Sequence, residues 1–434
     1  MIFKNFWANT YFRRLGIIVF SGVTILGTAS SCALPSFLGG SQPSTTTFGV
    51  IKKDPEVRDD GLFVRANAAK NLKGEIEQQG ISTYSVLKLV QINKDILFAL
   101  TKEKGLFKTI DSGITWQRLY PIKVNGAGDN SGISRNDNLI VNDFAVDINQ
   151  DKTIYISAKE NTFAKVYQSL DGGENFKEVY IGVETGIGAL LVTLDPVNPQ
   201  RIYAVLEKGA LIRSLDAGVT WQKIRSFKDI PIQIGFVPEF GNLLYILFAT
   251  DGLAVSKDNG ENFDINLLKK SASSIGEQQP KDGLDLTFSN SPNFGKYEKI
   301  IPVTAGLQFD FETKKASKPD SQSWILIADR QMWFSESSKS NFQKLVLPLQ
   351  SEQYNLADAA PDPSVGLNKI YASIDNQLFV TRNRGQSWSI QQIAGFNGNI
   401  GNIGSILIDK TNSEIMYLGL LNSKARRNSG FFIF

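Results

Sequence analysis

Histidine is absent from the 434-residue sequence, and cysteine occurs only once, as Cys32. Without imidazole there can be no Ser-His-Asp triad and no histidine-ligated metal. Without a second cysteine no intramolecular disulfide can form, so a folded domain must be stabilised by its core alone. We therefore predict no catalytic residue from these residue types, and we expect neither a metal nor a cofactor.

The sequence also lacks a large excess of charge of either sign. It contains 46 basic and 43 acidic residues, and residues 1–31 hold three of the basic ones and no acidic one. The remainder therefore carries 43 of each sign. A neutral domain has no general attraction for a polyanion, so nucleic acid is not expected as a partner.

The N-terminal residues have the pattern of a targeting segment. Basic residues precede an apolar run from Leu15 to Ala29, which is shorter than the roughly 20 residues of a membrane-spanning helix. Small residues then lead to Cys32. This resembles a bacterial lipoprotein signal, with residues 1–31 as signal peptide and Cys32 as the lipid-bearing residue. An ordinary cleaved signal and an uncleaved anchor are the alternatives.

Composition then divides the rest of the chain. Residues 32–47 are rich in Gly, Pro, Ser and Thr and are predicted to be a flexible tether. Residues 48–434 are predicted to form the folded domain, which is long enough for a large core. The lipoprotein pattern places this domain outside the cytoplasm, anchored to a membrane by its N-terminal lipid, at the cell surface or in the periplasm.

An eight-residue box recurs six times: Ser/Thr, any, Asp, any, Gly, any, Thr/Asn, aromatic. Four copies are clear, and two, residues 335–342 and 381–388, are degenerate. Short apolar runs flank each clear copy, which predicts that the box is the turn of a β-hairpin. The Asp would bind backbone N–H groups, the Gly would adopt a positive φ, and the aromatic ring would pack over the hairpin. The third, fifth and eighth positions are occupied by Asp111, Gly113 and Trp116; Asp171, Gly173 and Phe176; Asp216, Gly218 and Trp221; Asp258, Gly260 and Phe263; and Asn383, Gly385 and Trp388. A device that recurs at every hairpin indicates structure rather than catalysis.

The box resembles the Asp-box, or bacterial neuraminidase repeat, which implies a β-propeller. Successive boxes lie 60, 45, 42, 79 and 46 residues apart. A period in the mid-forties is typical of one four-stranded propeller blade, and the two long steps indicate insertions.

Six boxes account for six blades, and a seventh is predicted to begin near Ile400 with strands at 415–420 and 430–434. An open edge would invite aggregation, so an early segment, 48–52 or 62–65, is expected to supply the missing strand. We predict an all-β propeller of seven four-stranded blades, closed by strands from both ends of the chain. Eight blades are the alternative, because residues 284–311 hold spare strand-like sequence. Residues 66–79 are the one segment that could form a long helix.

Two insertions, 121–138 and 266–280, follow the fourth strand of a blade and should share the face opposite the boxes. Long loops on a rigid scaffold commonly bind ligands. The candidate binding residues there are Arg135, Asp137, Lys269 and Lys270.

Asp-box propellers include sialidases, xyloglucan-type glycosidases, sortilin-like receptors and the photosystem II assembly-factor family. The Arg-Ile-Pro tripeptide typical of sialidases is missing. Asp143, Asp147, Asp358 and Asp362 are candidates for the two carboxylates of a glycosidase. A chain with 43 acidic residues always offers such candidates, so they are a weak signal. A single exported propeller is more similar to the assembly-factor and sortilin-like proteins. We therefore expect a binding or assembly scaffold for a protein or glycan partner, with sialidase-like or xyloglucanase-like glycoside hydrolysis as the alternative.

Overall fold

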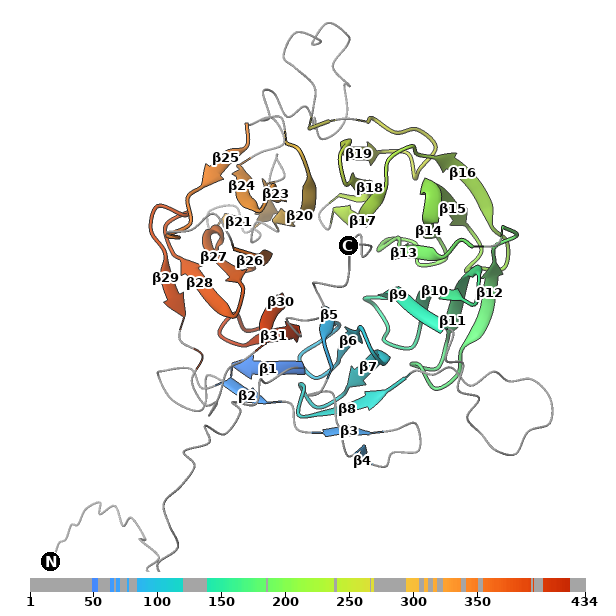
Figure 1. Cartoon of the computed structure of the whole chain (residues 1–434), viewed down its shortest axis with the longest axis horizontal. Helices are drawn as coiled ribbons and strands as arrows, with labels where there is room; N and C mark the ends of the chain where they lie inside the picture. The colour runs from blue at the N-terminus through green and yellow to red at the C-terminus, as the bar shows by residue number, and fades with distance from the viewer. Residues whose placement is uncertain are drawn as a thin grey trace, which may run out of the picture. The chain divides into compact units, whose positions relative to one another are not determined.

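The computed structural model describes residues 49–53, 63–65, 68–70, 76–77, 84–119, 139–184, 186–237, 240–265, 267–268, 294–303, 308–310, 315–317, 323–336, 341–349, 354–391, 393 and 401–421. These residues form strands and one short 3-10 turn, η3 (Glu207–Gly209). Figure 1 shows the sheets arranged radially around a common centre. The fold is a β-propeller, which confirms the all-β prediction.

Six blades follow the chain in order, each an antiparallel sheet whose first strand lies nearest the centre (Figure 1). Blade 1 contains β5 (Val86–Gln91), β6 (Leu97–Thr101), β7 (Gly105–Thr109) and β8 (Thr115–Arg118). Blade 2 contains β9 (Leu139–Val146), β10 (Ile154–Glu160), β11 (Phe163–Ser169) and β12 (Lys177–Ile181). Blade 3 contains β13 (Ala189–Leu194), β14 (Ile202–Leu206), β15 (Ala210–Ser214) and β16 (Gln222–Ser226). Blade 4 contains β17 (Pro231–Val237), β18 (Phe240–Phe248) and β19 (Gly252–Ser256). Blade 5 contains β20 (Tyr297–Val303), β23 (Ser323–Ala328), β24 (Gln331–Ser335) and β25 (Gln343–Leu345). Blade 6 contains β26 (Leu356–Asp362), β27 (Gly366–Ile374), β28 (Gln377–Thr381) and β29 (Ser389–Gln391).

The seventh blade combines strands from both ends of the chain. Its inner strands are β30 (Asn402–Ile408) and β31 (Met416–Leu421), and its outer strands are β1 (Gly49–Lys53) and β2 (Phe63–Arg65). Strand β1 pairs antiparallel with β31, from Gly49 opposite Leu420 to Lys53 opposite Met416. The predicted closure is therefore confirmed, and both early segments are used. The strand expected at 430–434 lies outside the described residues.

Three local features differ from the predictions. The segment 66–79 contains β3 (Ala68–Lys70) and β4 (Ile76–Glu77), and β3 pairs in parallel with β8, so no helix forms there. The spare sequence at 284–311 contributes β20 to blade 5. It also contributes β21 (Gln308–Asp310), which pairs with β22 (Lys315–Ser317), so its described residues form no eighth blade. Blade 4 has only a bridge, between Val255 and Asp264, in place of a fourth strand.

The core is divided among the blade interfaces. Seven clusters of buried side chains lie one at each interface, from blades 1 and 2 round to blades 7 and 1. The closing cluster joins Val50 of β1 and Tyr417 of β31 to Phe107 and Trp116 of blade 1. Each blade thus depends on both neighbours to cover its two apolar faces.

The alternation of antiparallel strands gives the ring two distinct faces. Turns between the first and second strands share one face with the box turns, which join the third and fourth strands. We call this the box face. Turns between the second and third strands share the other face with the connections between blades, and we call this the connector face. Strand β1 starts opposite the end of β31, so the chain enters the ring at the connector face.

Removal of β1 should unfold the ring from its closing blade. A chain that begins at residue 54 lacks β1, so the edge of β31 is left unpaired. The buried side chains that pack against Val50 become exposed as well. Relative to the chain from Ser41, we expect loss of cooperative thermal unfolding by circular dichroism and aggregation in gel filtration. An unchanged melting curve would contradict this closure.

Candidate functional site

The box turns share one hydrogen-bond arrangement. In the first, the Asp111 carboxylate accepts the Thr109 hydroxyl at 2.7 Å and the Thr115 backbone N–H at 2.8 Å. The Gly113 N–H donates to the Thr109 hydroxyl at 3.0 Å. The boxes centred on Asp171, Asp216 and Asp258 repeat these bonds within a few tenths of an ångström. The carboxylates are therefore occupied in holding their own turns.

The degenerate box at 381–388 keeps the arrangement with an amide in place of the carboxylate. Asn383 Oδ1 accepts the Ser387 N–H at 2.9 Å, and its Nδ2 donates to the Ser387 hydroxyl at 2.8 Å. The bonds of the turn thus need an oxygen at this position but no charge. The box at 335–342 lies partly outside the described residues, although Phe342 at its end is buried.

Each box glycine has a positive φ, between 79° and 98°. The residue before it is also left-handed, including Ser112, Ala217 and Arg384. A side chain at the glycine would meet the preceding blade: a Cβ on Gly385 would lie 2.1 Å from Leu345. The box aromatics complete this packing. Trp116 is fully buried and Phe176 nearly so, while Trp221, Phe263 and Trp388 are partly buried. The box thus serves both its own hairpin and the contact with its neighbour.

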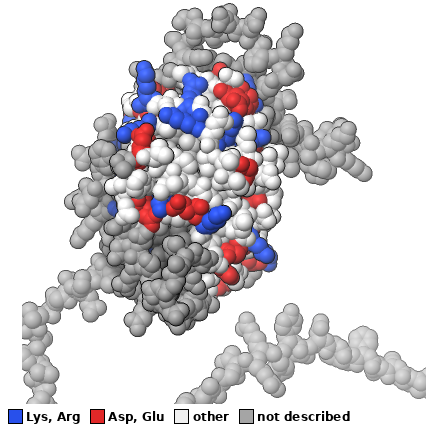
Figure 2. Space-filling view, turned by 90° about the vertical axis from the view of Figure 1, so that its right-hand side faces the viewer, with Lys and Arg blue, Asp and Glu red and all other residues white. Residues whose placement is uncertain are grey.

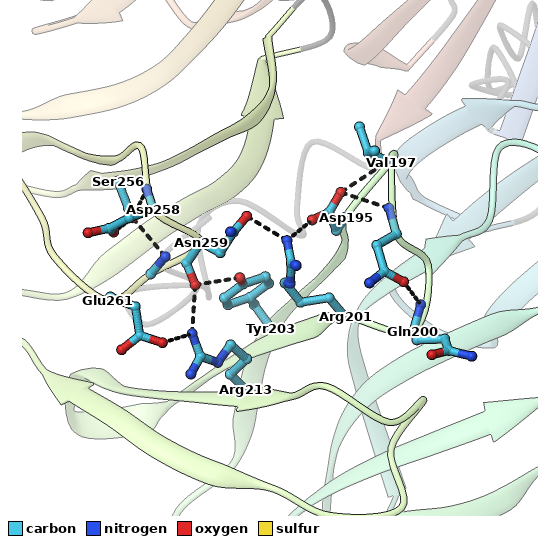
Figure 3. Close-up of polar contacts among 12 residues, drawn as sticks. Asp195, Val197, Gln200, Arg201, Tyr203, Arg213, Ser256, Asp258, Asn259 and Glu261 are labelled. Atoms are coloured by element: carbon cyan, nitrogen blue, oxygen red, sulfur yellow. Dashed lines mark hydrogen bonds and ion pairs between the residues drawn. The ribbon is translucent and has the colours of Figure 1, made fainter. Parts of the chain in front are cut away.

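Tyrosines form a second link between blades. The Tyr155, Tyr203 and Tyr417 hydroxyls donate to the carbonyl of the fourth box residue of the following blade, at 3.0, 2.7 and 3.1 Å. All three occupy the same place, near the start of the second strand. Figure 3 shows Arg201, Tyr203 and Arg213 converging on Asn259, whose carbonyl also accepts from Arg213 at 2.8 Å.

Sequence reasoning missed these tyrosines. The signal was a repeated Leu/Ile/Met followed by Tyr or Phe in the second strand of every blade except blade 5; the pair begins the strand in blades 1, 2, 3 and 7 and lies inside it in blades 4 and 6. Burial raises the pKa of Tyr155, Tyr203 and Tyr245 to about 12. A tyrosine nucleophile requires the opposite shift, so these residues are structural.

The carboxylates considered for hydrolysis are all engaged in structural contacts. Asp143 pairs with Lys88 Nζ at 2.6 Å and accepts the Val192 N–H at 3.2 Å, which ties three consecutive blades together. Asp358 does the same, with Lys299 Nζ at 2.5 Å and the Ile406 N–H at 3.0 Å. Asp143 lies in the middle of β9 and Asp358 in the first half of β26, so both are nearer to the connector face than Asp147 and Asp362 are.

Asp147 and Asp362 lie instead in the turns between first and second strands, on the box face. Asp147 accepts the Asn149 N–H at 2.9 Å. Burial acts to raise the pKa of Asp362, but hydrogen bonds from Ser364 and Lys369 outweigh it and hold the pKa below its usual value. The four carboxylates are therefore divided between the two faces, which separates Asp143 from Asp147 and Asp358 from Asp362.

The Lys–Asp contacts depend on a β-bulge that recurs in every first strand. The register of each first strand shifts in its first half in all seven blades, and β17 and β26 have a second shift near their ends. The residues that follow the shift are Lys88, Asp143, Leu191, Gln233, Lys299, Asp358 and Ser405. Gln233 bridges to both the N–H and the carbonyl of Ile300. Five of these seven residues, Lys88, Asp143, Gln233, Lys299 and Asp358, thus make contacts between blades that the sequence pattern did not reveal.

Glu298, the bulged residue of β20, is a titratable group that sequence reasoning also missed. Burial raises the pKa of its carboxyl, although Lys296 and Arg330 act against the shift. It lies at the connector face, beside the turn that contains Asp329 and Arg330. A raised pKa is what a general acid requires, so Glu298 is a described carboxyl suited to proton donation.

The predicted binding residues Arg135, Asp137, Lys269 and Lys270 lie outside the described residues, as do both insertions apart from Leu267 and Leu268. Cys32 and the tether lie outside them as well. Within the described part of the chain there is no group of acidic or cysteine residues that could hold a metal, and no helix that is long and apolar enough to cross a membrane.

The described surface is mixed in charge and poor in aromatics. On the side that carries β12 and β16, neither sign covers the surface (Figure 2). Every described Trp, Tyr and Phe side chain is buried or partly buried. The large apolar side chains that are exposed are all Ile, Leu or Val. None of the described aromatic side chains is therefore fully exposed on this surface.

Comparison of the sequence with protein-family models and with curated proteins gives no match. The structure is similar to a GH74 enzyme from Niastella koreensis, with 15% identity, a TM-score of 0.53, and coverage of 77% of this chain and 51% of that one. It is similar to the GH74 xyloglucanase from Xanthomonas campestris, with 14% identity, a TM-score of 0.51, and coverage of 78% and 51%. It is also similar to YCF48 from Cyanidioschyzon merolae, with 10% identity, a TM-score of 0.50, and coverage of 78% and 96%. The match spans about half of each GH74 chain. At these identities the likeness supports the propeller fold alone.

The box carboxylate can be tested at Asp111. Replacement by Ala removes an acceptor of several hydrogen bonds and should cost about 1–3 kcal/mol. Asp111→Asn should cost far less at neutral pH, because Asn383 already makes the equivalent bonds. The comparison is made by thermal unfolding of both variants. Equal losses for Asn and Ala would contradict this account.

The same pair of variants predicts a pH effect. Burial acts to raise the pKa of Asp111, but hydrogen bonds from Thr115 and Thr109 outweigh it and lower the pKa below 3.8. A lowered folded-state pKa stabilises the protein above pH 3.8, and this stabilisation is lost as the pH falls through the folded value. The melting temperature of Asp111→Asn should therefore fall less than that of the parent below about pH 4.

Proposed function

We propose that this chain is a lipid-anchored, extracytoplasmic Asp-box propeller that acts as a binding or assembly scaffold for a protein partner. The observation that carries the proposal is the occupation of the candidate carboxylates: Asp143 and Asp358 clamp blades, and Asp147 and Asp362 hold turns. A residue in such a contact is poorly placed to donate or abstract a proton during a reaction.

The exposed surface favours a protein over a glycan as the partner. Glycan sites commonly place an aromatic ring under the sugar, and the described aromatic side chains are not exposed. Exposed Ile, Leu and Val side chains are instead suited to the apolar centre of a protein interface. The inserted loops on the connector face are the proposed location of further contacts.

Glycoside hydrolysis is the second candidate function, and Glu298 is the observation that favours it. Its raised pKa would suit an acid at the connector face, the face to which the inserted loops are assigned. Asp329 lies beside it but accepts the Gly295 and Lys296 N–H groups, so we propose that a second carboxylate would come from those loops.

An activity panel separates the two functions. We expect the domain from Ser41 to release no reducing sugar or sialic acid from polysaccharides and sialosides. We also expect the immobilised domain to retain a protein from a solubilised cell-envelope fraction at a fixed stoichiometry, and the heat-unfolded domain not to retain it. Release that is abolished by Glu298→Gln but kept in Asp147→Asn would establish a glycosidase instead.

The proposed anchor is tested at Cys32. In the full chain expressed in bacteria, Cys32→Ser removes the only thiol that could carry the lipid. We expect labelled palmitate to enter the parent and not the variant. The variant should also leave the detergent-dependent membrane fraction or remain as an unprocessed precursor. Labelling of Cys32→Ser equal to that of the parent would contradict the lipoprotein assignment.

A further inference from the structure

An extended segment of the chain lies against the outer edge of blade 1. Strand β3 pairs in parallel with β8, with Ala68 opposite Thr115 and Lys70 opposite Gln117, and β4 pairs with the far side of β3. Figure 1 shows β3 and β4 at the rim of the ring, outside the four strands of the blade. The outer edge of blade 1 has therefore accepted an additional strand.

Neither chain connectivity nor protection of the edge accounts for this arrangement. The connection from β2 to β5 runs from residue 66 to residue 85, whereas residues 227–230 are enough to join β16 to β17. Strands β12 and β16 are longer than β8, yet each is the outermost strand of its sheet in the described part of the chain. Coverage of β8, and not of these longer edges, indicates a function that is specific to blade 1.

The edge of β8 presents main-chain groups to the segment beside it. The Leu119 N–H donates to the Leu106 carbonyl at 2.9 Å, toward β7. Main-chain groups of successive residues point to opposite edges of a strand, so those of Arg118 and Trp116 are directed toward β3. The Trp116 side chain is fully buried, and its Nε1 donates to the Gly113 carbonyl at 3.1 Å. The edge is thus held firmly, and its main-chain groups can pair with an extended segment of any sequence.

Strand β3 is a weak occupant of this edge. Its ladder with β8 is three residues long, and parallel pairing is slightly less stable per residue than antiparallel pairing. Its sequence, Ala-Ala-Lys, consists of residue types that are depleted in strands. Strand β4 adds only two residues to the sheet. A segment of β-branched or aromatic residues would therefore compete with β3 for the edge.

We propose that the outer edge of blade 1 is the docking site for an extended segment of a protein partner, which displaces β3 and adds to β8 as a strand. We call β3 and β4 together the strap, because they cover this edge in the resting protein. The inference rests on the proposed scaffold function and names the form in which the partner is recognised. In strand addition the main-chain hydrogen bonds supply affinity, so an unpaired segment rich in β-branched residues is the ligand that fits.

Peptide binding to a strapless variant tests the proposal. In the chain from Ser41, residues 66–79 are replaced by a Gly/Ser linker of equal length, which keeps β1, β2 and the closed ring. The probe is a fluorescein-labelled peptide of alternating Thr and Val, and its binding is measured by fluorescence anisotropy. We expect the variant to bind the probe about tenfold more tightly than the parent, because a tethered strap at an effective concentration of about 1 mM competes with a peptide whose dissociation constant is about 100 µM.

Two substitutions of Arg118 in the strapless variant separate main-chain pairing from other binding. Arg118→Pro removes an N–H from an exposed edge, where strands tolerate proline, and should abolish binding of the probe. Arg118→Ala is the matched control, which keeps the N–H and should bind the probe as the strapless variant does. Thermal unfolding of both variants checks that the ring remains folded.

Hydrogen exchange locates the bound peptide without a substitution in β8. In the strapless variant, the probe should slow amide exchange in β8 and leave exchange in β12 and β16 unchanged. Three results would overturn the proposal: equal affinity of parent and strapless variant, equal binding by folded Arg118→Pro and Arg118→Ala, or unchanged exchange in β8 with the probe bound. If the parent retains an envelope protein but the strapless variant binds no probe, the docking edge is wrong and the scaffold function stands.

Discussion

The packing of each blade against both of its neighbours is the interaction on which the rest of this structure depends. A four-stranded sheet has two apolar faces, and each can be buried only by the adjacent blade. The seven interfacial clusters show that no blade holds a core of its own. Closure of the ring is thus a condition of stability, and β1 provides it by pairing with β31. In a chain without disulfides, this contact between distant segments replaces a covalent constraint.

The recurring residues meet this condition in two rings. Box turns and tyrosines link neighbours near the box face, and five of the seven residues after the β-bulges, Asp143 and Asp358 among them, link neighbours at a second level along the strands. Because these links use backbone groups as acceptors and donors, they fix the distance between blades as well as their orientation. The second and sixth box residues take no part in these shared links and vary in type, although Glu261 and Glu336 pair with arginines of neighbouring blades. Function should therefore be sought at those positions and in the connectors.

Local signals made much of this fold predictable. The box pattern placed six hairpins, and the period between boxes gave the blade. The need to cover an edge strand predicted closure from both ends of the chain. The bulges and their Lys–Asp links could not be predicted, because the partners come from different blades: Lys88 and Asp143 are 55 residues apart. The segment 66–79 was misjudged because its helical periodicity is outweighed by pairing of β3 with the exposed edge of β8.

The contrast between local signals and contacts between blades also explains why the roles of the candidate carboxylates were ambiguous in the sequence. An Asp at the end of an apolar strand has the same local pattern whether it caps a turn, clamps a blade or donates a proton. The role of such an Asp depends on the groups that contact it in the folded chain. For Asp147 and Asp358 these groups include backbone N–H donors. Glu298 differs because burial raises the pKa of its carboxyl and no hydrogen bonds outweigh this effect, as they do at Asp362. A propeller becomes an enzyme when groups of that kind converge on one face. Burial raises the pKa of Glu298, whereas the candidate carboxylates Asp143 and Asp358 are paired with lysines and hold neighbouring blades together.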